Sequence, residues 1–471
     1  MTDANTPVLA RIPTGVPGLD EVTGGGFLKS GVYILQGAPG AGKTILANHI
    51  VHRHAASGGK VVYVTMLAES HGRMMQHMEG FSFFDLSALP DKVYYISAFN
   101  ALQSSGLKGV VDLLRHEMRS HRAGILVLDG LVMAAGAAES EEALKLFVSE
   151  IQAHSTLTGC TTLLLTSEHA DRPVSAEQTM VDGILLLRER AYGPRRERNI
   201  EVVKFRGSGT LRGNHAFRIG SEGITVYPRM EAARRQGAGD AVQPIGVSSG
   251  VPALDALFDI GGFATASVTA ISGASGSGKT TLALHFAARA SAADKGLYVG
   301  FYETPQLLGR IVELLGLGSR QDFEANVQFM WQPFGENMLD ALAHEVLQRV
   351  AQGGIRRVVI DGAGGLMSAP AYQERGGGFL SAFMHELSRL GATSVITVEE
   401  DEVNRFRTVD TSTMSALADT YVQLRLHTDD TVRRFASIRK SRISRSDLRV
   451  HELVLTPTGL DLRRVEAARA P

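Results

Sequence analysis

The sequence predicts two tandem α/β domains, each with a mostly parallel, twisted sheet that helices cover on both faces and that ends in C-terminal β-hairpins. Three observations lead to this prediction. Motifs recur at a constant offset of about half the 471-residue chain. Short, unbroken apolar runs alternate with amphipathic stretches, which is typical of strands buried on both faces and connected by helices. Each half also ends in the strand-rich sequence expected of hairpins.

The repeat consists of widely spaced pairs of motifs. They are PTGVPGLD at 13–20 and SSGVPALD at 248–255, GGGF at 24–27 and IGGF at 260–263, GAPGAGKT at 37–44 and GASGSGKT at 273–280, and KFR at 204–206 and KSR at 440–442. Lys43 and Lys279 of the third pair are 236 positions apart, and the fourth pair has the same separation. This constant offset indicates duplication of one domain, since a solenoid unit has only roughly 20–50 residues.

The repeat also sets the expected domain boundaries. We expect a first domain at 1–230 and a second domain at 244–471, joined by a linker at 231–243. The linker sequence EAARRQGAGDAVQ is polar, contains glycine and has no strand pattern. Such a composition is typical of a connection between domains.

The expected strands follow one another in the same rhythm in both domains. They are the apolar runs at 32–37, 61–66, 93–98, 125–130 and 161–167, and at 267–272, 296–301, 327–332, 358–362 and 393–398. Segments with helical apolar spacing, such as ILANHIVHRHAAS and EEALKLFVSEIQAHS, lie between them. Strands connected through helices run parallel, so these runs predict the parallel part of each sheet. The segment GILLLRER…NIEVVKFRG predicts a hairpin at the sheet edge.

Composition excludes several classes of protein. The 48 Lys and Arg residues balance 49 Asp and Glu residues, which argues against a protein that coats nucleic acid. No apolar run approaches the roughly 18 residues of a membrane span, and the first residues lack the pattern of a secretory signal. The one cysteine, Cys160, allows no intrachain disulfide and suits a reducing compartment. We therefore expect a cytoplasmic protein with neither nucleic acid nor a membrane as partner.

Both copies of the third motif satisfy the phosphate-loop pattern G-x-x-x-x-G-K-[ST]. Each follows an expected strand and opens an expected helix, which is the context that this motif requires. Its glycines let backbone N–H groups surround phosphates, and the helix N-terminus adds a favourable dipole. The predicted ATP-binding residues are Gly37, Ala38, Pro39, Gly40, Ala41, Gly42, Lys43 and Thr44, and Gly273, Ala274, Ser275, Gly276, Ser277, Gly278, Lys279, Thr280 and Thr281. The alternative, a glycine turn with an idle lysine, does not explain two copies in register.

Four residues are candidates for binding Mg²⁺. The hydroxyl groups of Thr44 and Thr280 follow the two lysines, and Asp129 and Asp361 each end an apolar strand downstream of a phosphate loop. In this class of fold such a threonine and such an aspartate hold the metal ion directly or through water. An aspartate after four apolar residues can alternatively just begin a turn.

An ATPase also needs a carboxylate that orients or deprotonates water. The expected strand after each phosphate-loop helix ends in VTMLAES, which carries Glu69, or in VGFYETP, which carries Glu303. Both glutamates lie at a strand end that faces the expected position of the γ-phosphate. We therefore predict catalytic roles for Glu69 and Glu303, with ordinary surface glutamates as the alternative.

A pair of cations lies near the end of each domain. Lys204 and Arg206 are two residues apart on an expected strand, so their side chains point the same way, and Lys440 and Arg442 repeat the arrangement. Cations so far from the phosphate loop in sequence have the character of arginine fingers supplied by a neighbouring subunit. The alternative is an edge strand whose charges prevent aggregation.

These motifs together resemble the KaiC family, the circadian-clock ATPase branch of the RecA/RadA superfamily. The resemblance rests on TGVPGLD, GGGF, the phosphate loop, the strand-end glutamate, the aspartate strand and the terminal K-x-R-G, and it spans nearly the whole chain as two RecA-like domains. It implies an ATP-dependent homohexamer, a double ring in which Lys204, Arg206, Lys440 and Arg442 reach ATP held by the next subunit. It also implies slow ATP hydrolysis in the first domain, and autokinase and autophosphatase activity in the second.

The sequence departs from the family pattern near the catalytic glutamates. KaiC has two adjacent glutamates at this strand end, whereas here Tyr302 occupies the first position and Glu303 the second. The first half has one glutamate in LAES, and its alignment requires a shift of one residue.

A second departure concerns phosphorylation. The family carries an adjacent Ser-Thr pair of phosphoacceptors, and here Ser415 is kept while Ala416 replaces the threonine. Thr411, Ser412 and Thr413 are nearby substitutes, although such a cluster also suits a solvated loop or a turn cap. We take Ser415 as the phosphoacceptor candidate. Only 29 residues follow Arg442, so we expect no KaiA-type partner, because KaiC binds KaiA through a longer tail.

Three functions remain open. The leading hypothesis is a hexameric ATPase that acts as a nucleotide-driven signalling switch or timer toward an unidentified signalling protein. The second is a DNA-handling motor, against which the acidic segment AAGAAESEEALK and the weakly basic SAPAYQERGGGF argue, since neither has the aromatic and basic residues of a single-strand tracker. The arginine run RERAYGPRRER is expected at a solvated hairpin tip. The third is a scaffold that binds ATP without hydrolysing it.

Overall fold

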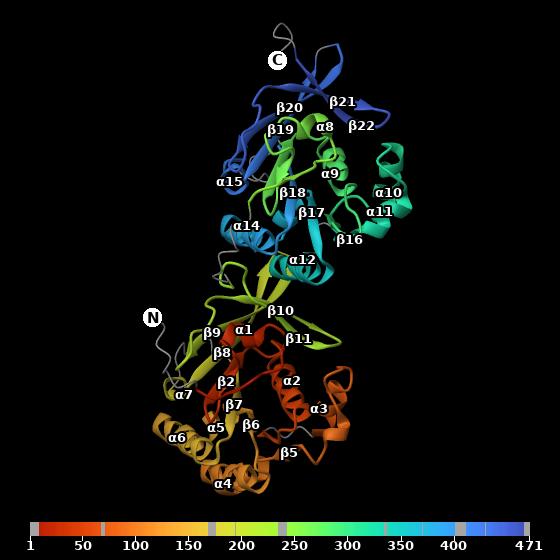
Figure 1. Ribbon diagram of the computed structural model, residues 1–471. Helices are drawn as coiled ribbons and strands as arrows, with labels where there is room; N and C mark the ends of the chain where they lie inside the picture. Colours follow the sequence, from red (N-terminus) through yellow and green to blue (C-terminus); the bar gives the residue numbers. More distant parts are fainter. Residues whose placement is uncertain are drawn as a thin grey trace. The chain divides into compact units, whose positions relative to one another are not determined.

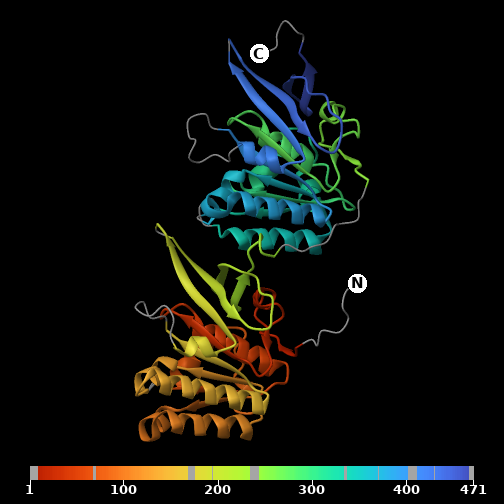
Figure 2. The same cartoon turned by 90° about the vertical axis from the view of Figure 1, so that its left-hand side faces the viewer.

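The computed structural model describes residues 9–66, 71–167, 176–193, 195–233, 243–333, 337–369, 371–400, 411–428 and 430–465. The chain divides into two compact units, Met1–Ala233 and Arg234–Pro471, which Figures 1 and 2 show in two views. Each unit is a separate α/β fold, described below by itself.

The described part of the first unit contains a nine-stranded sheet with the order β11-β10-β9-β8-β3-β7-β6-β4-β5. Its strands are β3 (Val32–Gly37), β4 (Val61–Thr65), β5 (Val93–Ser97), β6 (Ile125–Asp129), β7 (Thr161–Thr166), β8 (Gly183–Tyr192), β9 (Arg195–Phe205), β10 (His215–Gly220) and β11 (Gly223–Tyr227). The pairs from β5 through β8 are parallel, and those from β8 through β11 are antiparallel. The predicted fold class is therefore confirmed, including the C-terminal hairpins.

Both faces of this sheet are buried. Along β3, Tyr33 and Leu35 join one apolar cluster, whereas Val32 and Ile34 join a second cluster on the opposite face. This alternation follows from the pleat of a strand. Helix α2 (Lys43–Ala56) packs in the first cluster, and α4 (Phe99–Ser120) and α6 (Glu141–Thr158) pack side by side in the second. The remaining elements are α1 (Leu19–Thr23), α3 (His71–Met78), α5 (Leu131–Ala137), α7 (Ala176–Met180), the short helical turn η1 (Leu86–Ala88), and the strand pair β1 (Arg11–Ile12) and β2 (Phe27–Leu28).

The second unit repeats this plan. In its described residues nine strands have the order β16-β15-β17-β18-β14-β19-β20-β21-β22. They are β14 (Val268–Gly273), β15 (Lys295–Gly300), β16 (Val327–Trp331), β17 (Ile355–Asp361), β18 (Thr393–Glu399), β19 (Thr420–Thr428), β20 (Val432–Ser441), β21 (His451–Thr456) and β22 (Gly459–Arg464). The connections contain α8 (Pro252–Asp255), α9 (Lys279–Ala287), α10 (Pro305–Leu314), α11 (Arg320–Asn326), α12 (Leu339–Gly353), α13 (Ala363–Met367), α14 (Tyr372–Arg389) and α15 (Thr411–Leu417), with the strand pair β12 (Gly246–Val247) and β13 (Phe263–Ala264). Within the described ranges, none of the helices is long and apolar enough to cross a bilayer.

The arginine run at 188–198 forms the distal end of the β8–β9 hairpin, as the sequence analysis expects. β8 ends at Tyr192 and β9 begins at Arg195, and Arg188, Arg190 and Arg196 are exposed. Arg190 stacks over the Tyr192 ring at 4.9 Å, and Arg196 pairs with Glu189 across the ladder. Such pairs form because paired antiparallel strands place side chains close to one another across the ladder.

In each unit one histidine fastens the C-terminal hairpin to the phosphate-loop helix. The backbone N–H of Ile224 donates to Nδ1 of His49 (3.2 Å), and that of Leu460 donates to Nε2 of His285 (2.8 Å). The preceding residue is a glycine with positive φ in both units, and a Cβ there would lie within 2.8 Å of the ring in the first unit and within 2.3 Å in the second. This contact positions the hairpin beside the phosphate loop.

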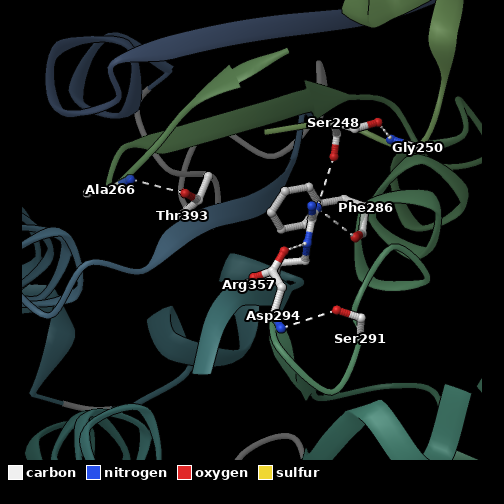
Figure 3. A network of polar contacts seen from close by, with 8 residues as sticks. All are labelled: Ser248, Gly250, Ala266, Phe286, Ser291, Asp294, Arg357 and Thr393. Atoms are coloured by element: carbon white, nitrogen blue, oxygen red, sulfur yellow. Dashed lines mark hydrogen bonds and ion pairs between the residues drawn. The ribbon is translucent and has the colours of Figure 1, made fainter. Parts of the chain in front are cut away.

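The second unit has a buried arginine that ties three of its segments together (Figure 3). Arg357, on β17, donates from Nε to Asp294 (2.6 Å) and from one terminal nitrogen to the carbonyl oxygens of Ser248 (2.9 Å) and Phe286 (3.4 Å). Its guanidinium also lies 4.9 Å from the centre of the Phe286 ring. The segments of Ser248, Phe286 and Asp294 are thereby linked to strand β17 of the sheet.

Candidate functional site

The first phosphate loop connects β3, which ends at Gly37, to α2, which begins at Lys43. Gly42 caps the helix with φ near 103°, a conformation that a side chain would strain. The Lys43 ammonium donates to the carbonyl oxygens of Gly37 (2.7 Å) and Ala38 (3.0 Å). The loop therefore curls around its own lysine, with the helix N-terminus open toward the same space.

The second loop, from the end of β14 to the start of α9, has the same geometry. Gly278 caps α9 with φ near 104°, and the Lys279 ammonium donates to Gly273 and Ala274 carbonyls, both at 2.8 Å. Burial lowers the pKa of Lys279, and neighbouring carboxylates oppose that shift. The two loops thus hold their lysines in matching positions.

Each predicted metal-binding pair is brought together by the fold. The Thr44 hydroxyl donates to Asp129 at 3.3 Å, and the Thr280 hydroxyl donates to Asp361 at the same distance. Burial raises the pKa of Asp129, and hydrogen bonds from Tyr63 and Thr44 oppose the shift. Hydroxyl and carboxylate oxygens are the ligands that Mg²⁺ prefers. Because they lie at a glycine-cradled helix N-terminus, these residues fit Mg²⁺ with a triphosphate.

A buried tyrosine, which the sequence analysis missed, supports each aspartate. Tyr63 on β4 donates to Asp129 (3.0 Å), and Tyr298 on β15 donates to Asp361 (2.6 Å). Burial raises the pKa of both phenols well above the usual value, and the neighbouring carboxylates raise it further. The available signal was the tyrosine at the third position of VVYVT and at the corresponding position of GLYVG.

The second loop opens into a cavity of about 510 Å³. Its walls include Tyr302, Glu303, Asp361 and Glu399 from the carboxyl edge of the sheet, together with the hairpin residues Arg434, Leu455 and Leu460. Burial raises the pKa of the Glu303 carboxyl, and the nearby charge of Asp361 adds to the effect. Glu303 is thus placed beside the phosphate loop, whereas Glu69 lies outside the described residues.

Arg434 is a further site residue that sequence reasoning missed. From β20 its Nε donates to the carbonyl oxygen of Gly276 at 2.9 Å, in the middle of the phosphate loop. Arg198 stands 236 positions earlier, on β9 of the first unit. An arginine repeated at the domain offset was the signal that pointed to this position.

In each unit the cation pair lies at the amino ends of the parallel strands, opposite the edge that carries the phosphate loop. The Arg206 N–H donates to the carbonyl oxygen of Asp182 (2.7 Å), and the Asp182 N–H donates to Val32 (2.8 Å). Val32 precedes Gly37 by five residues on β3, a distance of roughly 17 Å along the strand. Arg442, Asp419 and Val268 repeat this arrangement in the second unit. The fold therefore separates each pair from the phosphate loop of its own unit.

The same short helix anchors the cations in each unit. Lys204 donates to the carbonyl oxygens of Gln178 (3.1 Å) and Thr179 (3.0 Å) at the last turn of α7. Lys440 donates to those of Ser415 and Ala418 at the end of α15. Cations at a helix C-terminus complement its dipole. A β-bulge precedes each lysine, and such bulges redirect side chains.

The phosphoacceptor candidate Ser415 lies within this anchoring helix. Its carbonyl oxygen accepts from Lys440, and Arg442 donates to the next carbonyl, that of Ala416. The three alternative phosphoacceptors belong to the first turn of α15, and the structure does not describe their side chains: Thr411, Ser412 and Thr413. Ser415 is thus coupled to the cation pair through the backbone.

Comparison with known proteins matches both units to one family. The KaiC ATPase family model matches residues 12–231 and 247–465. A circadian clock protein KaiC2 from Synechocystis sp. is 25% identical over 98% of this chain and 83% of its own length. The circadian clock oscillator protein KaiC of Thermostichus vulcanus is 23% identical over 98% of this chain and 90% of its own length.

A third relative matches more strongly over a shorter region. The circadian clock oscillator protein KaiC of Parasynechococcus marenigrum is 29% identical over 294 residues. That alignment covers 59% of this chain and 55% of the relative, so the chain spans about half the length of this protein.

Proposed function

Because the chain belongs to the KaiC family of ATPases, we propose that it binds and hydrolyses ATP as a homohexameric double ring and acts as a nucleotide-driven signalling switch or timer. One observation carries the proposal: a phosphate-loop lysine and a threonine–aspartate pair meet in both units, with the lysines 236 positions apart. The same arrangement in two copies implies selection for nucleotide chemistry in both.

Different residues of the chain have separate roles in the proposed hydrolysis. Lys43 and Lys279 exchange their loop carbonyls for the β- and γ-phosphates, while the loop N–H groups surround the phosphates. Thr44 with Asp129, and Thr280 with Asp361, would hold Mg²⁺, and the ion would neutralise charge on the phosphates. Glu303 accepts a proton from water in the second site, and its raised pKa suits that role. Glu69 is the proposed counterpart in the first site.

The placement of the cation pairs supports assembly of several chains. Lys204, Arg206, Lys440 and Arg442 lie at the sheet edge remote from the phosphate loop of their own unit, so they do not serve the nucleotide of that unit. We assign them to a nucleotide held by another copy of the chain. The four cations donate hydrogen bonds to backbone carbonyl oxygens of α7 and α15, which fix their position. Loss of the γ-phosphate would remove their counter-charge at the seam between subunits. Hydrolysis would thereby change the ring surface that a signalling protein recognises.

Autophosphorylation at Ser415 is the finer part of the proposal. The hydrogen bond from the Lys440 ammonium to the carbonyl oxygen of Ser415 connects the candidate phosphoacceptor to a cation that is proposed to contact the neighbour's ATP. A phosphate on Ser415 would add charge beside Lys440 and Arg442 and so alter the seam.

The direct test uses γ-labelled ATP and Mg²⁺ with the wild-type protein, Lys43→Ala and Lys279→Ala. We expect label in free phosphate, reduced by each substitution according to the share of its site. Label in protein that disappears with Lys279→Ala would establish autophosphorylation in the second unit. Label in neither phosphate nor protein would contradict hydrolysis and leave the ATP-held scaffold. Light scattering with ATP and with ADP then measures the assembly, for which we expect the mass of six chains with ATP.

The role of the cations across subunits is tested by mixing two inactive variants. Lys43→Ala removes the phosphate contact and Arg206→Ala removes the proposed neighbouring cation. To isolate the first site, both carry Lys279→Ala. Mixed rings should regain activity, because some seams combine an intact loop with an intact arginine. Absence of recovery at every mixing ratio would contradict the role of Arg206 across subunits.

A further inference from the structure

Strand order brings three carboxylates to one edge of the second sheet. β15, β17, β18 and β14 are neighbours in this order. Glu303 follows β15, Asp361 ends β17, and Glu399 ends β18. Glu399 pairs in register with Gly273, the first residue of the phosphate loop. Because carboxyl ends of parallel strands meet at the same edge, Glu399 stands between the metal-binding aspartate and the loop.

The Glu399 side chain faces the nucleotide cavity. It is exposed, and it lines the same cavity as Lys279, Tyr302 and Glu303. Burial lowers the pKa of Lys279, and the charge of Glu399 opposes this shift more strongly than that of Asp361. After burial, Glu399 is also the largest contributor to the raised pKa of Tyr302. The carboxylate is therefore close to both residues.

The adjacent Glu400 faces elsewhere, which makes Glu399 distinctive. Glu400 accepts hydrogen bonds from Ser272 (2.6 Å), Tyr421 (3.3 Å) and Gln423 (3.2 Å). These partners lie on β14 and β19, and Glu400 does not line the cavity. Successive residues of an extended chain point to opposite sides, so the two glutamates have different hydrogen-bond partners. The charge of Glu400 also acts on Lys279, but less strongly than that of Glu399.

The first unit has no carboxylate at the equivalent position. Gln36 pairs with Thr166, so the next residue, Ser167, stands beside Gly37 as Glu399 stands beside Gly273. In the second unit Tyr302 directly precedes Glu303, where the family has two adjacent glutamates. Glu399 thus brings a second carboxylate to the second site from a different strand.

We propose that Glu399 is a catalytic residue of the second site, which orients the water molecule that attacks the γ-phosphate of ATP. This inference rests on the proposed ATP hydrolysis. Glu399 accepts a hydrogen bond from the water while Glu303 takes its proton. As the water oxygen bonds to the γ-phosphorus, the bond to the bridging oxygen breaks and ADP leaves with that electron pair. The products are ADP, phosphate and the proton on Glu303, which solvent later removes.

The test isolates the second site in the full-length Lys43→Ala protein. In this background, Glu399→Gln removes the charge, and Glu399→Ser installs the residue of the first unit. Glu400→Gln is the matched control, since it makes the same change one residue away and outside the cavity. Steady-state phosphate release gives kcat and KM, and a fluorescent ATP analogue measures binding separately.

We expect both Glu399 variants to lower kcat by about 100-fold, as for loss of a positioned general-base partner, with KM and analogue binding unchanged. Glu400→Gln should retain the kcat of its background. An unchanged kcat in Glu399→Gln, while Glu303→Gln lowers it, would overturn the inference and leave ATP hydrolysis standing. Weaker analogue binding with unchanged kcat would overturn it equally, since it would assign Glu399 to binding.

Two further outcomes separate the inference from the function on which it rests. If wild-type protein releases phosphate and Lys43→Ala releases none, the second site does not hydrolyse, and the role of Glu399 is overturned while first-site hydrolysis stands. If the wild-type protein also releases none, the proposed function fails together with the inference.

Discussion

The two nucleotide sites have the same central hydrogen bonds and differ in the residues around them. In both, the loop lysine donates to two loop carbonyl oxygens, and a threonine and a tyrosine donate to the same aspartate. In the second site Asp361 also accepts from the Thr397 hydroxyl at 2.6 Å, and Thr397 in turn accepts from the Gly362 N–H. In the first site the apolar Leu165 pairs in register with Asp129.

This difference shows which positions the duplication left free to diverge. The proposed binding of phosphates and Mg²⁺ requires the same ligands in both copies, which would explain why the loop, threonine and aspartate occur in both. The neighbouring strand β18 has no such requirement, and it carries Thr397 and Glu399 where β7 has Leu165 and leads to Ser167. Among the described residues at these positions, the second site therefore has the additional polar groups, which favours a chemical task distinct from that of the first.

Replacing either aspartate of the proposed metal sites should have the largest effect. Asp129→Asn and Asp361→Asn should each lower phosphate release at the affected site by about 100-fold or more, because a neutral amide no longer balances the ion. Each is measured in a protein whose other site carries the lysine-to-alanine substitution. Equal losses in both would support a shared metal role, and a loss confined to one unit would break the comparison.

The buried arginine of the second unit should matter next. Arg357→Ile, which copies Ile125 of the first unit, should lower the stability of the second unit by roughly 2–3 kcal/mol. The cost is below that of a fully buried pair because 34% of the Asp294 side chain remains exposed. Hydrogen exchange of each unit measures this. Arg356→Ala, one residue earlier and exposed, is the control and should change little; protection lost in the first unit would contradict the local role of Arg357.

Acid should destabilise the two units to different extents. In the first unit burial lowers the pKa of His49 and His52 to about 4, and it also lowers the pKa of His54 and His71. In the described part of the second unit, His285 is the histidine whose pKa burial lowers. Their stabilising contribution is complete above pH 6.5, where the unfolded histidines are also neutral. It is lost as the pH falls toward 4, because the unfolded chain then binds protons that the folded chain excludes.

We therefore expect the first unit to lose more stability than the second between pH 7 and pH 5. Urea unfolding followed by hydrogen exchange in each unit measures the difference. His49→Gln should reduce the acid sensitivity of the first unit. Equal loss in both units would show that the buried histidines do not control it.

The smallest expected effect concerns the tyrosines. Tyr63→Phe and Tyr298→Phe each remove one hydrogen bond to a buried carboxylate that keeps other donors, which should cost about 1–1.5 kcal/mol of stability. Because the bond from Tyr298 is shorter, 2.6 Å against 3.0 Å, we expect the larger loss in the second unit. Thermal unfolding at saturating ATP measures both, and a larger loss in Tyr63→Phe would reverse the ranking.

Much of the architecture could be predicted because its signals are local or repeated. The alternation of apolar runs and amphipathic segments predicted both sheets and their hairpins, and the structure confirms them. The arginine run at 188–198 lies at the end of the β8–β9 hairpin, as expected, but the sequence does not show how far the two strands continue to pair on either side of the turn.

Within the sites, sequence reasoning identified the residues of contiguous motifs and overlooked those that come from distant strands. Lys43 and Thr44 belong to one short pattern, whose chemistry is legible without a structure. Arg434 meets Gly276 from 158 residues away, and Tyr298 meets Asp361 across 63 residues. A lone arginine or tyrosine in an apolar strand gives no local sign of such a contact.

The sequence by itself therefore determined the two-domain duplication, the phosphate loops and the family, since each follows from short motifs and their constant spacing. Only the tertiary structure decided that Glu399 stands beside Gly273 and that Arg206 lies far from the loop of its own unit. The physical reason is that both placements depend on strand order and register. These are set by many weak packing contacts summed over the whole sheet, and no single motif encodes them.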